Sequence, residues 1–94
     1  MGQSGKWANR LTSATDLQDE VIPGQPLVEI VGDFRVLVEK HMGVTEYGES
    51  VIQVKVKFGS VCVCGRNLEL ALMTKEQLVI TGRIESVKFV RREK

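Results

Sequence analysis

The sequence has few aromatic residues, little excess charge and no long apolar run, and each shortage argues against a class of protein. Aromatic residues make up 5% of its 94 residues, which is too few for a platform on which nucleic-acid bases stack. The net charge of +1 lacks the basic excess of a dedicated nucleic-acid binder. No stretch approaches the roughly 20 apolar residues that span a bilayer.

Cysteine is also scarce, with Cys62 and Cys64 alone. The N-terminus lacks the apolar stretch of a signal peptide, so the two cysteines indicate a reducing, cytoplasmic compartment. Positions two apart in a strand share a face, and both thiols should therefore point the same way. A lone Cys-x-Cys falls short of the four ligands of structural zinc, and its geometry suits a disulfide poorly. We interpret both as small apolar core residues.

What the sequence does contain is an alternating apolar pattern within one small domain. Apolar residues occupy every second position from Ile52 to Phe58, Gly59 and Ser60 interrupt the run, and it resumes at Val61. This period of two predicts a hairpin with one face in the core and a charged face in water.

The rest of the chain is predicted to be arranged around this hairpin. Residues 1–25 are expected to form a helical arm with a Pro/Gly linker, residues 26–90 an all-β domain, and residues 91–94 a basic tail. The fold class is mainly β, an antiparallel meander or rolled sheet of about six to eight short strands. The arm has apolar residues at helical spacing, which predict one short amphipathic helix or two with a break: Trp7, Leu11, Ala14, Leu17, Val21 and Ile22.

Two details of the β domain have alternative interpretations. Residues 67–77 are rich in helix formers, but the alternating leucines at 68, 70 and 72 favour a strand. Glycines recur 16, 17 and 17 residues apart, at Gly32, Gly48, Gly65 and Gly82. We interpret this period as that of a meander or bent, rolled sheet; the alternative is that glycines mark every second turn. Turns are also predicted at residues 66–67 and 82–83.

No constellation of residues points to catalysis. His41 follows a predicted strand and has Glu39 and Glu46 nearby, but it lacks the oriented partner that a general base requires. Motifs for phosphate loops, nucleophile elbows and zinc proteases are missing from the sequence. We therefore predict a surface or turn histidine, no catalytic, cofactor-binding or metal-binding residue, no small-molecule substrate, and no enzymatic activity.

Charge is distributed unevenly along the chain. Residues 1–47 hold four Lys/Arg against seven Asp/Glu, a net −3, whereas residues 48–94 hold nine against five, a net +4. This asymmetry is compatible with head-to-tail self-association. The basic end formed by Lys88, Arg91, Arg92 and Lys94 suits an anionic lipid surface or nucleic acid, although such an end more often keeps a last strand from pairing with other chains.

Three motifs carry a family resemblance: residues 38–43 (VEKHMG), the spacing from Gly59 to Gly65 followed by Arg66, Asn67 and Leu68, and residues 80–87 (ITGRIESV). With the Trp-bearing N-terminal segment, they make the chain from about Lys6 to Phe89 similar to the YabP/YqfC family of sporulation proteins, in particular its YqfC branch. The resemblance implies a small cytoplasmic protein of the mother cell in endospore-forming bacteria, and it transfers no catalytic residues.

Together these observations favour a non-enzymatic structural or scaffolding component of sporulation. We expect it to form homo-oligomers, or to assemble with coat or forespore-membrane proteins at the forespore surface. Small β domains with exposed edges are suited to such contacts. The alternative is a regulatory binding module that contacts nucleic acid or anionic membrane through its basic C-terminal strand.

Overall fold

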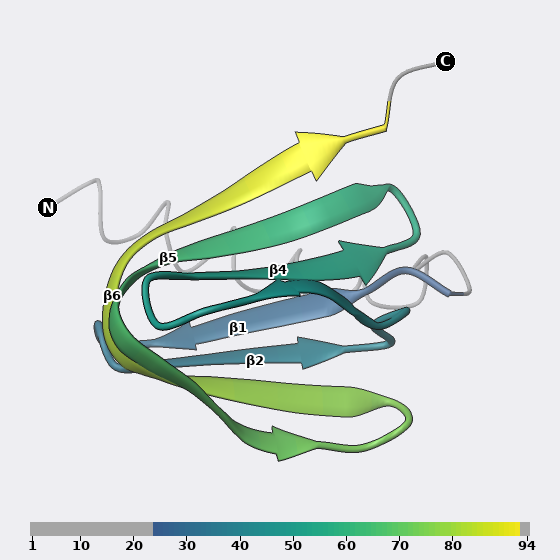
Figure 1. Ribbon diagram of the computed structural model, residues 1–94. Coiled ribbons are helices and arrows are strands. Elements are labelled where there is room, and N and C mark those ends of the chain that lie inside the picture. Colours follow the sequence, from purple (N-terminus) through teal and green to yellow (C-terminus); the bar gives the residue numbers. More distant parts are fainter. Residues whose placement is uncertain (1–23, 93–94) are drawn as a thin grey trace, which may run out of the picture.

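The computed structural model describes residues 24–92, which form one antiparallel sheet of six strands (Figure 1). The strands are β1 (Leu27–Val31), β2 (Arg35–Glu39), β3 (Val44–Tyr47), β4 (Val51–Val56), β5 (Gly59–Met73) and β6 (Gln77–Arg91). Their order across the sheet is β1-β2-β6-β5-β4-β3. The mainly β, antiparallel fold predicted from the sequence is confirmed. The helix predicted within residues 6–22 lies outside the described residues.

The sheet folds back on itself because β5 and β6 are each 15 residues long and are bent. This β5–β6 ribbon carries one hairpin on each half, since β2 pairs with residues 77–81 of β6 and β4 pairs with residues 59–64 of β5. Figure 1 shows the two long strands curving round one side of the molecule, with β1, β2 and β4 between their two arms. The sheet is therefore rolled, and two of its strands are long rather than short.

A core of aliphatic side chains lies between the two layers of the folded sheet. Every described polar side chain lies outside this core. The buried residues are mostly β-branched, which suits packing on a pleated surface: Val36, Val38, Ile52, Val54, Val56, Val61, Val63, Leu68, Leu78, Ile80 and Ile84. The alternation predicted for β4 is confirmed, because Ile52, Val54 and Val56 are buried and Lys55 between them is exposed.

The bend of the ribbon, which we call the corner (residues 65–68 of β5 and 82–84 of β6), holds the turns of both shorter hairpins. The backbone N–H groups of Gly65 and Leu68 donate to the carbonyls of Ser50 and Glu49, at 3.0 and 2.8 Å. On the other strand, the N–H groups of Gly82 and Ile84 donate to the carbonyls of Phe34 and Asp33, at 3.3 and 2.7 Å. The corner thus satisfies backbone groups that the bend removes from the strand ladder.

The turns predicted at residues 66–67 and 82–83 are wrong, because both long strands continue through these positions. Asn67 has a φ of 52°, and the pairing register shifts between Arg66 and Glu69. Both are marks of a β-bulge, which bends a strand without ending it. The recurring glycines therefore do not mark every second turn: Gly32 and Gly48 lie in hairpin connections, while Gly65 and Gly82 lie in the corner.

Two further details of the ribbon differ from, or decide between, the sequence interpretations. The helical alternative for residues 67–77 is wrong, since β5 extends to Met73 and pairs there with Leu78. The central hairpin is confirmed, but it turns at Lys57 and Phe58, and Gly59 already pairs with Val56. The alternation of leucines was thus a better guide than helix propensity, because the partner strand decides the conformation here.

Candidate functional site

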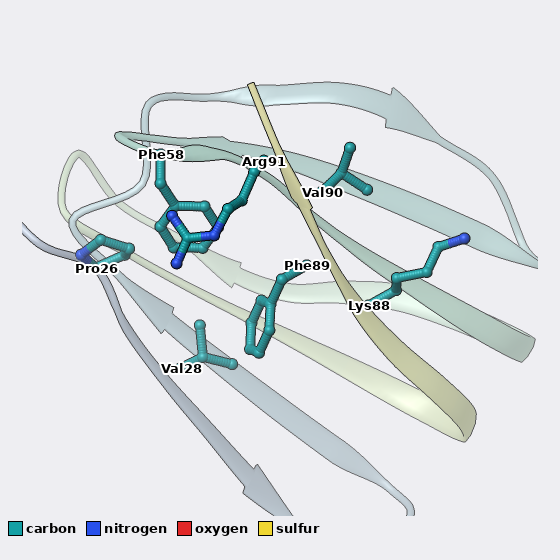
Figure 2. Close-up of a pocket in the computed structure, with 7 residues that line it drawn as sticks. All are labelled: Pro26, Val28, Phe58, Lys88, Phe89, Val90 and Arg91. Carbon is teal, nitrogen blue, oxygen red and sulfur yellow. The ribbon is translucent and has the colours of Figure 1, made fainter. Parts of the chain in front are cut away.

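A groove lies beside the last part of β6, and we call it the β6 groove. It has a volume of about 820 Å³ and is lined by Pro26, Val28, Phe58, Lys88, Phe89, Val90 and Arg91. Figure 2 shows Val28, Phe58, Phe89 and Arg91 turned toward a common space, with Lys88 and Val90 on the other side of β6. The groove therefore joins the start of β1 to the end of the ribbon.

The groove exists because the end of β6 has a partner strand on one side only. Residues 86–91 pair with β5, while β2 pairs with β6 no further along than Thr81. Phe89 pairs with the buried Val61 and so points to the inner face, as does Val87. Yet 56% of Phe89 is exposed, because no described strand covers it. An inward-facing aromatic side chain is thus left accessible.

Aromatic and cationic groups meet on the floor of the groove. The rings of Phe58 and Phe89 contact edge to face, with centroids 5.9 Å apart and an interplanar angle of 83°. The guanidinium carbon of Arg91 lies 5.4 Å from the centroid of the Phe58 ring, within the range of a cation–π interaction. No carboxylate in residues 24–92 forms an ion pair with Arg91. The groove therefore offers an apolar floor with a positive edge.

Further cations lie next to the groove. A smaller depression of about 430 Å³ has Lys55, Arg91 and Arg92 among its lining residues. The Arg92 guanidinium donates to the carbonyl of Lys57 at 3.2 Å, which holds the C-terminal end of the described chain against the β4–β5 turn. The basic end expected from the sequence is thus partly the edge of the groove, and Arg91 is the last residue of β6 rather than part of a tail.

The side chain of His41 connects two loops through hydrogen bonds to their backbone. Its Nδ1 accepts a hydrogen bond from the Gly43 N–H at 3.0 Å, so its Nε2 carries the proton that is donated to the Thr74 carbonyl at 2.8 Å. These bonds link the β2–β3 connection to the β5–β6 turn, where the Lys40 N–H also donates to the Glu76 carbonyl. Both ring nitrogens are therefore engaged by backbone, in keeping with the predicted turn histidine.

The cysteines lie on the same face, as predicted, but that face is the outer one. Cys62 and Cys64 are partly exposed and alternate with the buried Val61 and Val63. Interpreting them as core residues was therefore wrong. Their Sγ atoms are 3.9 Å apart, and burial, followed by the neighbouring Cys64 thiol, raises the pKa of the Cys62 thiol. A raised pKa lowers the thiolate fraction, so Cys62 is not an activated nucleophile.

Sequence patterns located the groove residues only in part. The shared face of Val87 and Phe89 was evident from their spacing and is confirmed. That Phe89 is uncovered was not evident, because alternation shows which way a side chain points but not what lies opposite it. Among residues 24–92, no three His, Cys, Asp or Glu side chains are grouped as metal ligands. The same residues include no helix long and apolar enough to cross a membrane.

The fold and the groove define a small rolled-sheet protein with an exposed, partly apolar groove, and comparison with known proteins places it in a family. The sequence model of the YabP family matches residues 24–94, so the chain belongs to the YabP family. The uncharacterized protein YqfC of Bacillus subtilis (strain 168) is 25% identical over 80 residues, covering 85% of this chain and 86% of that protein. No solved structure matches the chain. The resemblance drawn from the sequence motifs is confirmed.

Proposed function

We propose that the protein is a non-enzymatic structural or scaffolding component of sporulation, which acts in the cytoplasm of the mother cell by binding other copies of itself through the β6 groove. Its place in the YabP family supports the link to sporulation, since that is the role expected for the family. Coat or forespore-membrane proteins are further partners in this proposal.

The observation that carries the proposal is the exposure of Phe89, which lies in the part of β6 that has no second partner strand. Large apolar side chains that are left uncovered together mark interaction surfaces. Val90, on the opposite face of the same edge, is also 42% exposed. Aromatic residues and arginine are the types that dominate binding energy at protein interfaces, and Phe58, Phe89 and Arg91 supply both.

Charge favours another copy of the chain as the occupant of the groove. The groove and its surroundings belong mostly to the basic half of the sequence, with Arg91 and Arg92 at one end. The other half, residues 1–47, has a net charge of −3. Complementary surfaces of one chain assemble head to tail, and their attraction steers encounter.

Light scattering after size-exclusion chromatography of the full chain tests this proposal. We expect concentration-dependent oligomers at micromolar concentration, and we expect Phe89→Ser to shift the chain to monomer because it removes the exposed ring from the groove. Phe34→Ser is the matched control, since Phe34 is 54% exposed in the β1–β2 turn, at the opposite end of β1 from the groove. A wild-type chain that stays monomeric, or equal effects of the two variants, would contradict the proposal.

A second candidate function rests on the cations around the smaller depression. Lys55, Arg91 and Arg92 line it together, which suits the phosphates of an anionic membrane or nucleic acid. Changing Arg91 and Arg92 together to Ala would then abolish binding to phosphatidylserine vesicles or to DNA at low salt. If the wild-type chain binds neither the vesicles nor DNA at low salt, this candidate fails and self-association remains as the proposed function.

A further inference from the structure

The β6 groove lies where the chain enters the sheet, and the chain before that point has the composition to cover it. We propose that residues 6–22, folded as an amphipathic helical arm, pack their apolar side into the β6 groove. This inference rests on the proposed function, because it names the segment of the chain that enters the same groove. It assigns Phe58, Phe89 and Arg91 as the receiving side chains.

The first described residues of the chain lie beside the groove. Pro26 lines the groove itself. At Gly24, a Cβ atom would lie 3.6 Å from Cδ and Nζ of Lys57, and Lys57 directly precedes Phe58 in the β4–β5 turn. The described chain therefore begins at one end of the groove.

The arm has an apolar side that needs a partner. Its apolar residues recur three and four apart and would share one side of a helix: Trp7, Leu11, Ala14, Leu17 and Val21. A helix of 17 residues is close to the minimum length that is stable in water, where isolated helices shorter than about 12–15 residues are marginal. The apolar floor formed by Val28, Phe58 and Phe89 supplies the missing cover.

Charge also matches between the arm and the groove. The half of the arm nearest the sheet carries Asp16, Asp19 and Glu20, and it has no Lys or Arg between Leu11 and Pro23. The groove presents the Arg91 guanidinium, which forms no ion pair with a carboxylate of the described residues. Arg92 lies close by on the same end of the chain. An acidic helix beside these cations is favourable, whereas a basic one would be repelled.

Tryptophan fluorescence of the full chain tests the inference, because Trp7 is its single tryptophan. We expect a blue-shifted emission maximum and weak quenching by acrylamide. Phe89→Ser should move the emission to that of a solvated tryptophan and raise the quenching constant accordingly, while Phe34→Ser should leave both unchanged. A second chain carrying Trp7→Phe and Leu17→Trp reports on the half of the arm nearer the groove. Circular dichroism of each variant checks that the sheet remains folded.

The outcomes separate cleanly. The inference is supported if either tryptophan is shielded in the wild-type background, loses that shielding in Phe89→Ser and keeps it in Phe34→Ser. The inference is overturned if both tryptophans are fully solvated in the wild-type background. It is also overturned if they are shielded but Phe89→Ser does not change their emission or quenching, because the arm would then pack elsewhere.

The same variants distinguish the inference from the proposed function. If Phe89→Ser abolishes oligomers while both tryptophan probes are unaffected, self-association through the groove stands and the arm is not its ligand. If Phe89→Ser releases the arm in a chain that is monomeric at every concentration, the arm occupies its own groove and self-association fails. If release and dissociation occur together with the same concentration dependence, the arm of one copy occupies the groove of another.

Discussion

The corner of the β5–β6 ribbon and the ends of that ribbon are built from the same two strands, but they are packed very differently. At the corner, Leu68 is 2% exposed and Ile84 is 9% exposed. The turns of both shorter hairpins accept hydrogen bonds there from the backbone N–H groups of β5 and β6. At the ends, large apolar side chains are 42–56% exposed: Leu72, Met73, Phe89 and Val90. The ribbon is tightly fitted in its middle and loosely covered at its ends.

This difference separates what folds the protein from what is available for contact. A bend in a two-stranded ribbon gives up ladder hydrogen bonds, and here the hairpin turns replace them, so the corner admits little variation. The ends have a partner strand on one side only and can accept another chain without disturbing the core. Substitutions at the corner should therefore change stability, and substitutions at the ends should change association.

The largest effect is expected from Gly65→Ala, which breaks the corner. A methyl group at Gly65 would overlap the carbonyl oxygen of Arg83 on the facing strand. Backbone atoms cannot move aside as a flexible side chain does, so the two strands would have to separate. We expect a loss of more than about 3 kcal/mol in the free energy of unfolding, above the 1–3 kcal/mol of ordinary overpacking, measured by urea denaturation.

Gly48→Ala is the matched control for this substitution. A Cβ at Gly48 would meet the carbonyl oxygen of Val51 at 3.5 Å, an ordinary contact, and Gly48 has no positive φ. We expect its free energy of unfolding to change by less than about 0.5 kcal/mol. If both alanine variants were equally stable, the close approach of β5 and β6 at the corner would be disproved.

A smaller loss of stability is expected from Leu68→Ala, and Leu72→Ala allows the corner and the end of the same strand to be compared. Leu68 is buried at the corner, whereas Leu72, further along β5, is 45% exposed. Removing a buried leucine side chain leaves a cavity and costs about 2–5 kcal/mol, while Leu72→Ala removes surface that water already reaches and should cost less than about 1 kcal/mol. Thermal and urea unfolding of the pair measure the difference, and equal losses would contradict the packing described here.

The sequence predicts most of the strands but neither the corner nor the groove. Alternation is a local property, and it identified the inner faces of β4 and β6 correctly. Asn67 and Gly82 were mistaken for turn residues because a bulge and a turn both favour positive φ. The glycine period did not reveal how each hairpin turn pairs with a distant strand, because that pairing depends on contacts that the local sequence does not encode. Exposure of Phe89 is a non-local property of the same kind.

The smallest effect concerns Cys62, on the outer face of β5 between the corner and the end. Burial is the main cause that raises the pKa of its thiol above the ordinary 9.0; Cys64 and Glu46 add to the shift and Lys88 opposes it. A group whose pKa is raised by folding stabilises the fold below its unfolded pKa, and this contribution is lost as the pH rises through the folded pKa. Thiolate, the reactive form, therefore appears at higher pH in the folded protein.

The rate of iodoacetamide alkylation against pH checks this expectation. In the Cys64→Ser variant Cys62 is the single thiol, and because burial is the largest cause of its shift, the rate should still rise at higher pH in the folded chain than in the same variant unfolded in urea. The unfolded chain is the matched control, since sequence and reagent are identical and unfolding removes the burial together with the smaller, opposing contributions of Lys88 and Glu46. A folded-state curve at or below the unfolded one would mean that Cys62 is as solvated as the exposed ends of the ribbon, and that the tight packing of the corner does not extend to this position.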